Sequence, residues 1–194
     1  MKILKFMLAL AISCMAAYAE PADSAFSHLY VGIEGGEIYP FGDLIDAVDN
    51  TFFGGVGVRY TYWEDFDGFI QFNYSYFMPV ADSVNIYGVH QFSGRFGLDW
   101  RWSKIRPLAI GAGFICNWAR VDYDDENSDL AFSEPGGTLT DNETEFGWFA
   151  RLNLPCWHKG NFYAGLDILW EELWTLPKRS NMLSVGVYLE RRIW

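Results

Sequence analysis

One short segment combines residue types that nucleophilic chemistry could use. It reads H-Q-F-S, with His90 and Ser93 at its ends. A serine nucleophile needs a base within hydrogen-bond reach, but residues three apart in an extended strand point to opposite faces. The other candidates, His28 and His158, are predicted to lie before the first strand and in a turn, with solvent or interface roles. The sequence therefore does not favour catalysis by a His–Ser pair.

A second candidate for chemistry is the acidic segment 121–145, which contains no Lys or Arg. Clustered carboxylates offer the hard oxygen ligands that Ca²⁺ prefers. The segment D-Y-D-D-E-N-S-D nevertheless lacks the Gly and the terminal Glu of an EF-hand loop. A solvated loop without a cofactor is the favoured interpretation, with a divalent-cation site or a protein-binding site as alternatives. The metal-ligand candidates are Asp122, Asp124, Asp125, Glu126 and Asp129.

A third group of charged residues shares one face of the predicted strands, opposite the apolar side chains. Its members are Glu34, Arg59, Arg95, Asp99, Arg101, Arg151, Asp167, Glu171, Glu190 and Arg192. Arg stays charged when buried and offers a planar fork to a carboxylate. We predict a structural ion-pair network in a lumen, for which inward glycines leave room, and a proton or ion path is the alternative. The pairing depends on strand register, which the sequence does not specify.

Strands must position these side chains, and the clearest strand is F-S-G-R-F-G-L-D-W-R-W at 92–102. Apolar residues or Gly alternate with polar ones, and a period of two indicates a strand with two unlike faces. Strands of about nine to eleven residues can cross a bilayer at a tilt of about 45°. The same pattern recurs at 29–39, 52–62, 69–78, 108–118, 146–154, 162–170 and 183–194.

The connections between these segments alternate in length. Short ones are predicted at 64–67, 103–106 and 155–160, and long ones at 40–50, 80–86, 121–145 and 171–181. Short turns at one rim and long loops at the other are typical of an outer-membrane barrel. Aromatic residues gather at both strand ends, as the girdles at the two membrane interfaces require. A soluble β-sandwich is the alternative for the same strands.

The first nineteen residues have the features of a secretory signal peptide. Lys2 and Lys5 precede an apolar run that ends in Ala17-Tyr18-Ala19, and a lipoprotein site at Cys14 is the weaker alternative. Because this leader carries two Lys and no acid, its removal takes the formal charge from −11 to −13. Such a charge argues against nucleic acid as a partner. Cys116 and Cys156 are expected at opposite strand ends and therefore unbonded.

The leader, the eight alternating strands, the loop rhythm and the terminal aromatic residue resemble the small outer-membrane barrels. Examples are the transmembrane domain of outer membrane protein A and the outer membrane protein X group. The resemblance implies insertion into outer-membrane lipids by the barrel-assembly machinery, and roles in envelope anchoring, adhesion or host interaction. One departure is that Arg192 and Glu190 stand where the family has apolar residues before its terminal aromatic. A bulge near Arg191 would restore the register; otherwise the assembly signal differs.

Lipid A deacylases also resemble this chain in size, but their spacing is His-x-Ser rather than His-x-x-Ser. We therefore predict an all-β fold, an eight-stranded antiparallel up-and-down transmembrane β-barrel in the bacterial outer membrane. Residues 1–19 form the signal peptide, 20–28 a short periplasmic segment and 29–194 the barrel. The expected protein is a monomer without catalysis, with a structural or surface-binding role through long extracellular loops. A lipid-modifying enzyme and a narrow pore are the alternatives.

Overall fold

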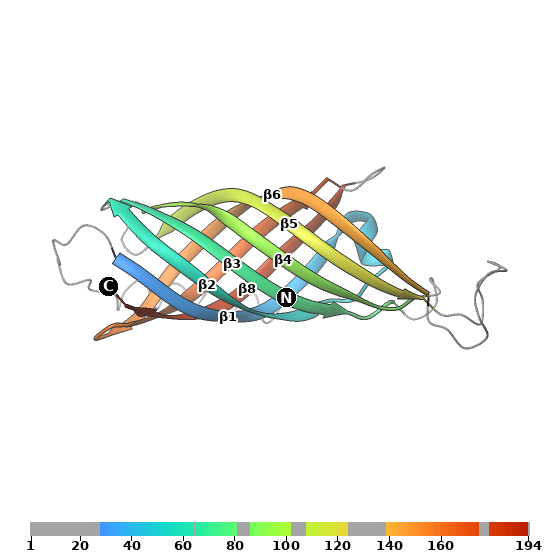
Figure 1. The fold of residues 1–194 in the computed structure, drawn as a ribbon, viewed down its shortest axis with the longest axis horizontal. Coiled ribbons are helices and arrows are strands. Elements are labelled where there is room, and N and C mark those ends of the chain that lie inside the picture. Colours follow the sequence, from blue (N-terminus) through green and yellow to red (C-terminus); the bar gives the residue numbers. More distant parts are fainter. Residues whose placement is uncertain are drawn as a thin grey trace.

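The computed structural model describes residues 28–63, 65–80, 86–101, 108–123, 139–174 and 179–193. Eight antiparallel strands close into a barrel in which β8 returns to β1 (Figure 1). The strands are β1 (His28–Phe41), β2 (Thr51–Trp63), β3 (Phe66–Phe77), β4 (Ile86–Arg101), β5 (Ala109–Tyr123), β6 (Leu139–Lys159), β7 (Phe162–Leu173) and β8 (Ser180–Arg192). The predicted fold class is confirmed. The predicted leader lies outside the described residues.

The barrel wall has two chemically opposite faces, as the period of two predicts. On β3, Phe72 is 62% exposed although it is apolar, whereas its neighbours Gln71 and Asn73 are buried. The same inversion recurs on β1, where Ile33 is 60% exposed while Tyr30 is buried. A continuous exposed apolar surface is unfavourable in water. It suits a wall whose outer solvent is lipid and whose polar residues point inward.

Several strands are longer than the sequence pattern predicts. β5 and β6 continue into the segment 121–145 that was predicted to be a loop, with five further residue pairs beyond Trp118↔Thr144. β6 also continues to Lys159, so His158 lies in a strand and not in a turn, and β1 begins at His28. The sequence pattern does not predict these extensions, because their residues are polar. Strand pairing uses backbone hydrogen bonds and does not require apolar side chains.

The last strand has no bulge near Arg191, which was one of the two alternatives for its departure from the family pattern. β8 keeps a regular register with both neighbours, through Tyr30↔Arg192 on one side and Phe162↔Arg191 on the other. Glu190 therefore points into the barrel, where it binds an arginine described below. Register shifts do occur elsewhere in the wall, in β2 between Thr61 and Trp63, in β4 between Ile86 and Gly88, and in β6 between Pro155 and Trp157.

Part of the apolar core lies at the long-loop end of the barrel. The short 3-10 helix η1 (Gly42–Asp46) packs against β1 and β8 at this end (Figure 1). The following residue pair, Val48↔Pro79, forms an isolated bridge between the first two long loops. The apolar core of the interior consists of Ile38, Val48, Phe53, Phe69, Phe77, Ile115, Phe149, Leu169, Leu173 and Met182. Among the described residues, no helix is long and apolar enough to span a membrane.

Candidate functional site

Near the rim that carries the chain ends, Arg59 lies between two carboxylates from other strands. Its Nε is 3.1 Å from Glu190 Oε2, and its Nη1 is 2.9 Å from Asp67 Oδ2. Arg101 also reaches Asp67, with Nη2 2.6 Å from Oδ2, and the Thr61 hydroxyl donates to the other oxygen of Asp67. This group joins β2, β3, β4 and β8 across the interior.

Asp67 was missed by the sequence analysis, which assigned it to the short turn 64–67. In the structure β3 begins at Phe66, so Asp67 is an inward residue of that strand and is 1% exposed. The alternation of inward and outward residues along the strand could have identified Asp67 as an inward residue. Asp67 lies two residues before Phe69 and four before Gln71, both on the same face.

The middle of the interior holds Arg151 between Asp167 and Asp99. The Nε and Nη2 atoms of Arg151 are 2.8 and 2.7 Å from the two Asp167 oxygens, a two-pronged contact. Its Nη1 is 3.1 Å from Asp99 Oδ2. The guanidinium also lies over the Phe69 ring, 4.2 Å from the ring centroid. Both aspartates are 1% exposed, so water screens these charges little.

The third group surrounds Arg95, which is 1% exposed. Its Nε donates to Glu171, and its Nη1 is 3.6 Å from Glu34 Oε1. Gln71 donates from Nε2 to the other oxygen of Glu34 at 2.8 Å. Because these residues come from β1, β3, β4 and β7, the group connects opposite sides of the wall.

The three groups share one feature, an arginine that bridges two carboxylates from different strands, and the first group contains a second arginine, Arg101. The groups contain nine of the ten predicted interior residues, and the tenth, Arg192, contacts Asn161. Its Nη2 lies 3.5 Å from Asn161 Oδ1 at the rim. A Cβ at Gly111 would collide with the Asp99 carboxylate, so this inward glycine leaves room for the middle group. The strand register determines which carboxylate each arginine meets, and the residue types alone do not predict these partners.

The outer surface near the long-loop end carries a separate polar group centred on His90. Tyr74 Oη is 2.9 Å from His90 Nδ1, and His90 Nε2 is 3.5 Å from Asp122 Oδ2. Arg120 Nε donates to the second oxygen of Asp122 at 3.1 Å. Ser93, by contrast, is buried on the interior face. The sequence therefore predicted the separation of His90 and Ser93 correctly, but gave no sign of the contacts with Tyr74 and Asp122.

The acidic segment is described only in part. Asp122 lies within β5 and is engaged by the contacts above. The other candidate ligands, Asp124, Asp125, Glu126 and Asp129, lie outside the described residues. Within the described ranges, no three or more His, Cys, Asp or Glu side chains form a group that could hold a metal ion. Calcium binding by this segment therefore stays a prediction from the sequence.

Cys116 and Cys156 are both free thiols.

A closed eight-stranded barrel with an apolar exterior and a polar, ion-paired interior is the architecture of the small outer-membrane β-barrels. The interior of an eight-stranded barrel is just wide enough for its own side chains to fill. The fold and the outer wall thus give the chain the architecture of a transmembrane β-barrel.

Comparison with solved structures identifies particular barrels of this kind. Neisserial surface protein A matches at a TM-score of 0.59 and 9% identity, covering 85% of this chain and 97% of that one. Ail, the attachment invasion locus protein of Yersinia pestis, matches at 0.54 and 14% identity, covering 84% and 97%. OprG from Pseudomonas aeruginosa matches at 0.51 and 11% identity, covering 87% and 98%. No family model and no curated protein sequence matches the chain.

Proposed function

We propose that the protein is a non-catalytic outer-membrane barrel that presents an acidic hairpin to a positively charged partner outside the cell. The observation that carries the proposal is the extension of β5 and β6 by five residue pairs beyond Trp118↔Thr144. The two strands remain hydrogen-bonded as far as Tyr123↔Leu139. Figure 1 shows β4, β5 and β6 converging on one tip at this end. The pairing holds Tyr123 and Leu139, the described ends of the acidic segment, side by side beyond Trp118.

The charge of the hairpin favours a cationic partner. Glu143 is exposed on the described part of β6, and residues 124–138 of the sequence contain five acids and no Lys or Arg. Charges of one sign gathered on a surface steer partners of the opposite sign toward it. Ail has been crystallised with sucrose octasulfate, a heparin analogue. A polysulfated ligand has the wrong sign for this hairpin, so we infer a different class of partner, with Ca²⁺ as the small-ion alternative.

The proposal is tested with the protein in lipid nanodiscs and poly-L-lysine or heparin as probes. Wild type is expected to bind poly-L-lysine and not heparin, and binding should weaken steeply with salt, since charges are screened within about 8 Å at physiological ionic strength. Asp124→Asn, Asp125→Asn and Glu126→Gln together should weaken poly-L-lysine binding at least about tenfold. The matched control is Asp49→Asn, which removes an exposed charge from another loop. Preferential heparin binding, or equal effects of both changes, would contradict the proposal.

The lipid-modifying alternative draws on one observation, the contact of His90 with Asp122 on the outer surface. A hydrolase of this kind also needs a nucleophile beside the histidine. Ser93 faces the interior and is buried, so the geometry supports binding rather than acyl transfer. Mass spectra of lipid A incubated with the purified protein are expected to be unchanged, whereas a lost acyl chain would establish the enzyme.

A further inference from the structure

The outer wall has a hollow of about 550 Å³ over the seam where β6, β7, β8 and β1 lie side by side. Its lining is mostly apolar, and its outward-facing members are Ile33, Gly35, Ala164, Leu166, Val187 and Leu189. The inward-facing Glu34, Gly165 and Tyr188 also line it. Leu166 forms part of the floor and is only 4% exposed, because it packs against Leu154. The hollow is therefore a lipid-facing depression above a packed base.

Strand register explains why the wall is hollow at this point. One cross-strand row consists of Ala164, Leu189 and Ile33, and the next of Leu166, Val187 and Gly35. Each row contains one small residue, Ala164 in the first and Gly35 in the second. Ala164 lies at the β7 end of its row and Gly35 at the β1 end. The irregularity in β6 places Cys156 at the edge of the hollow. The large side chains around Ala164 and Gly35 therefore form walls, and the small residues leave the space between them.

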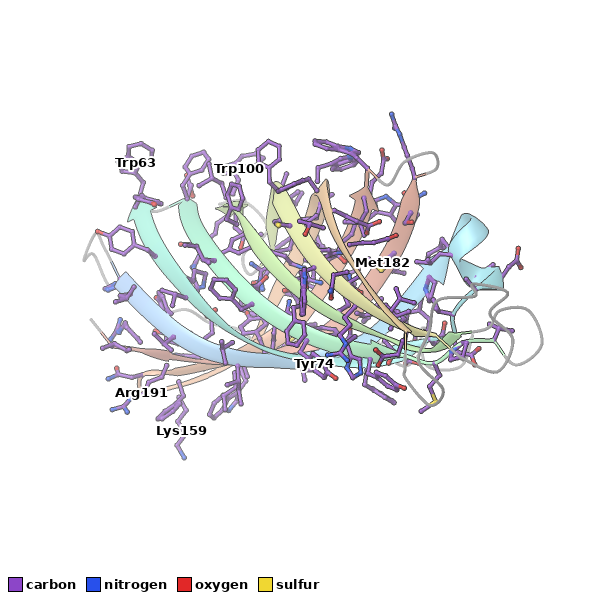
Figure 2. All side chains as sticks on the ribbon, turned by 45° about the vertical axis from the view of Figure 1, so that its right-hand side comes forward. Trp63, Tyr74, Trp100, Lys159, Met182 and Arg191 are labelled. Atoms are coloured by element: carbon purple, nitrogen blue, oxygen red, sulfur yellow. The ribbon has the colours of Figure 1, made fainter. Side chains whose placement is uncertain are left out.

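Two cations lie at the end of this hollow nearest the chain ends. The next row toward that rim pairs Lys159 with Phe162 and Phe162 with Arg191. The Arg191 guanidinium is 5.7 Å from the Phe162 ring centroid. Both cations are exposed, and Figure 2 shows Lys159 and Arg191 on the same side of the barrel, pointing away from the wall. Arg191 follows Leu189 on the same outward face of β8, so apolar surface leads directly to positive charge.

We propose that this surface binds one phospholipid with an acidic headgroup from the membrane leaflet next to the chain ends. An acyl chain fills the hollow between Ala164 and Gly35, and the phosphate lies between Lys159 and Arg191. Long cationic side chains can keep their charge at the membrane interface while their stems cover apolar surface. Cations at that depth attract anionic lipid headgroups. The combination of an apolar hollow and two adjoining cations favours a specific lipid site over nonspecific contact between lipid and the outer wall.

The test is native mass spectrometry of the barrel released from nanodiscs that contain equal amounts of phosphatidylglycerol and phosphatidylcholine with identical acyl chains. Wild type is expected to retain one phosphatidylglycerol preferentially. Lys159→Gln and Arg191→Gln should each lower that retention about fivefold, which is the effect of about 1 kcal/mol per cation near a membrane surface. The matched control is Arg179→Gln, which removes an exposed arginine that ion-pairs with Glu172 at the other end of the barrel.

A second variant tests the hollow without changing charge. Ala164→Leu fills the space and is expected to abolish retention, whereas Ala112→Leu places the same side chain on an exposed outward position of β5 and should leave it intact. A gel that separates boiled from unboiled samples verifies that each variant folds. Equal retention of the two lipids by wild type, an equal loss in Arg179→Gln, or retention that survives Ala164→Leu would each overturn the proposal.

Discussion

At the scale of single residues, the interior depends on arginines that bridge carboxylates. Burying ions is costly unless each is paired and hydrogen-bonded, and Arg151 meets this condition with Asp99 and Asp167. The alternation of the sequence predicts which residues point inward, because parity is a local property of a strand. It does not predict partners. Arg151 and Asp99 are 52 residues apart, and only the register of the closed barrel brings them together.

Removal of the arginine from the middle group is expected to be severe. Arg151→Met leaves Asp99 and Asp167 as buried carboxylates without their counter-ion, which should cost about 3–5 kcal/mol of unfolding free energy. Addition of Asp99→Asn and Asp167→Asn to the same variant should recover most of that loss, because no buried charge then remains unpaired. Urea unfolding in lipid vesicles measures both. Arg179→Gln is the control, expected within about 0.5 kcal/mol of wild type because the Arg179 side chain is 69% exposed. A comparable loss in the control would argue against the bridging role.

The space reserved for the middle group can be tested at Gly111. A Cβ there collides with the carboxylate of Asp99 and lies 2.9 Å from the Leu98 carbonyl oxygen. Gly111→Ala is therefore expected to lower the unfolding free energy by about 1–3 kcal/mol. Gly54→Ala is the matched control, because a Cβ at Gly54 meets nothing within 4 Å. Equal stabilities of the two variants would show that the interior has more free space than the structure indicates.

At the scale of the elements, strand number and order followed from the sequence, but several strand lengths did not. The apolar pattern fades where a strand leaves the bilayer, since neither face then needs apolar residues. Arg120 and Asp122 on β5 are polar for this reason, yet they remain paired with β6. Glu190 shows the opposite case. Glu190 stands where the family has an apolar residue in its last strand. Its carboxylate nevertheless points inward and pairs with Arg59, and β8 keeps a regular register.

Hydrogen exchange distinguishes a rigid hairpin from a loose one. The backbone amides of residues 119–123 that bond to β6 should exchange more slowly in nanodiscs than free-chain amides. At least about tenfold protection is expected, corresponding to a local opening free energy of about 1.4 kcal/mol or more. If the paired amides of β5 and β6 beyond Trp118 exchange as fast as free-chain amides, the proposed presentation of the acidic segment loses its structural basis.

At the scale of the whole molecule, the barrel is a filled cylinder that separates a charged interior from an apolar exterior. Phe149 and Leu169 are 0% exposed, and Ile115 and Met182 are 1% exposed. These apolar side chains share the interior with the ion pairs. Figure 2 shows Trp63 and Trp100 projecting outward near one rim, where amphipathic rings suit a membrane interface. Within the described residues, apolar side chains and ion pairs thus fill the interior of the barrel.

A packed interior predicts no steady ion conductance. Purified protein in planar bilayers should leave the baseline current unchanged at voltages at which larger porins conduct, because apolar side chains and paired charges occupy the path. Double truncation with Phe149→Ala and Met182→Ala widens the interior and is the positive comparison. Stable single-channel steps from wild type would support the narrow pore that the sequence left open as an alternative.

The central claim is that lipid is the solvent of the outer wall, on which Ile33, Phe72 and Phe52 are each at least 60% exposed. The most direct measurement follows leaderless protein that is diluted from urea into buffer with and without lipid vesicles. With vesicles, the account predicts a protease-resistant, vesicle-bound barrel whose unboiled and boiled samples migrate differently on a gel. Without vesicles or detergent, it predicts aggregation. A soluble, monodisperse and folded protein in plain buffer would contradict it.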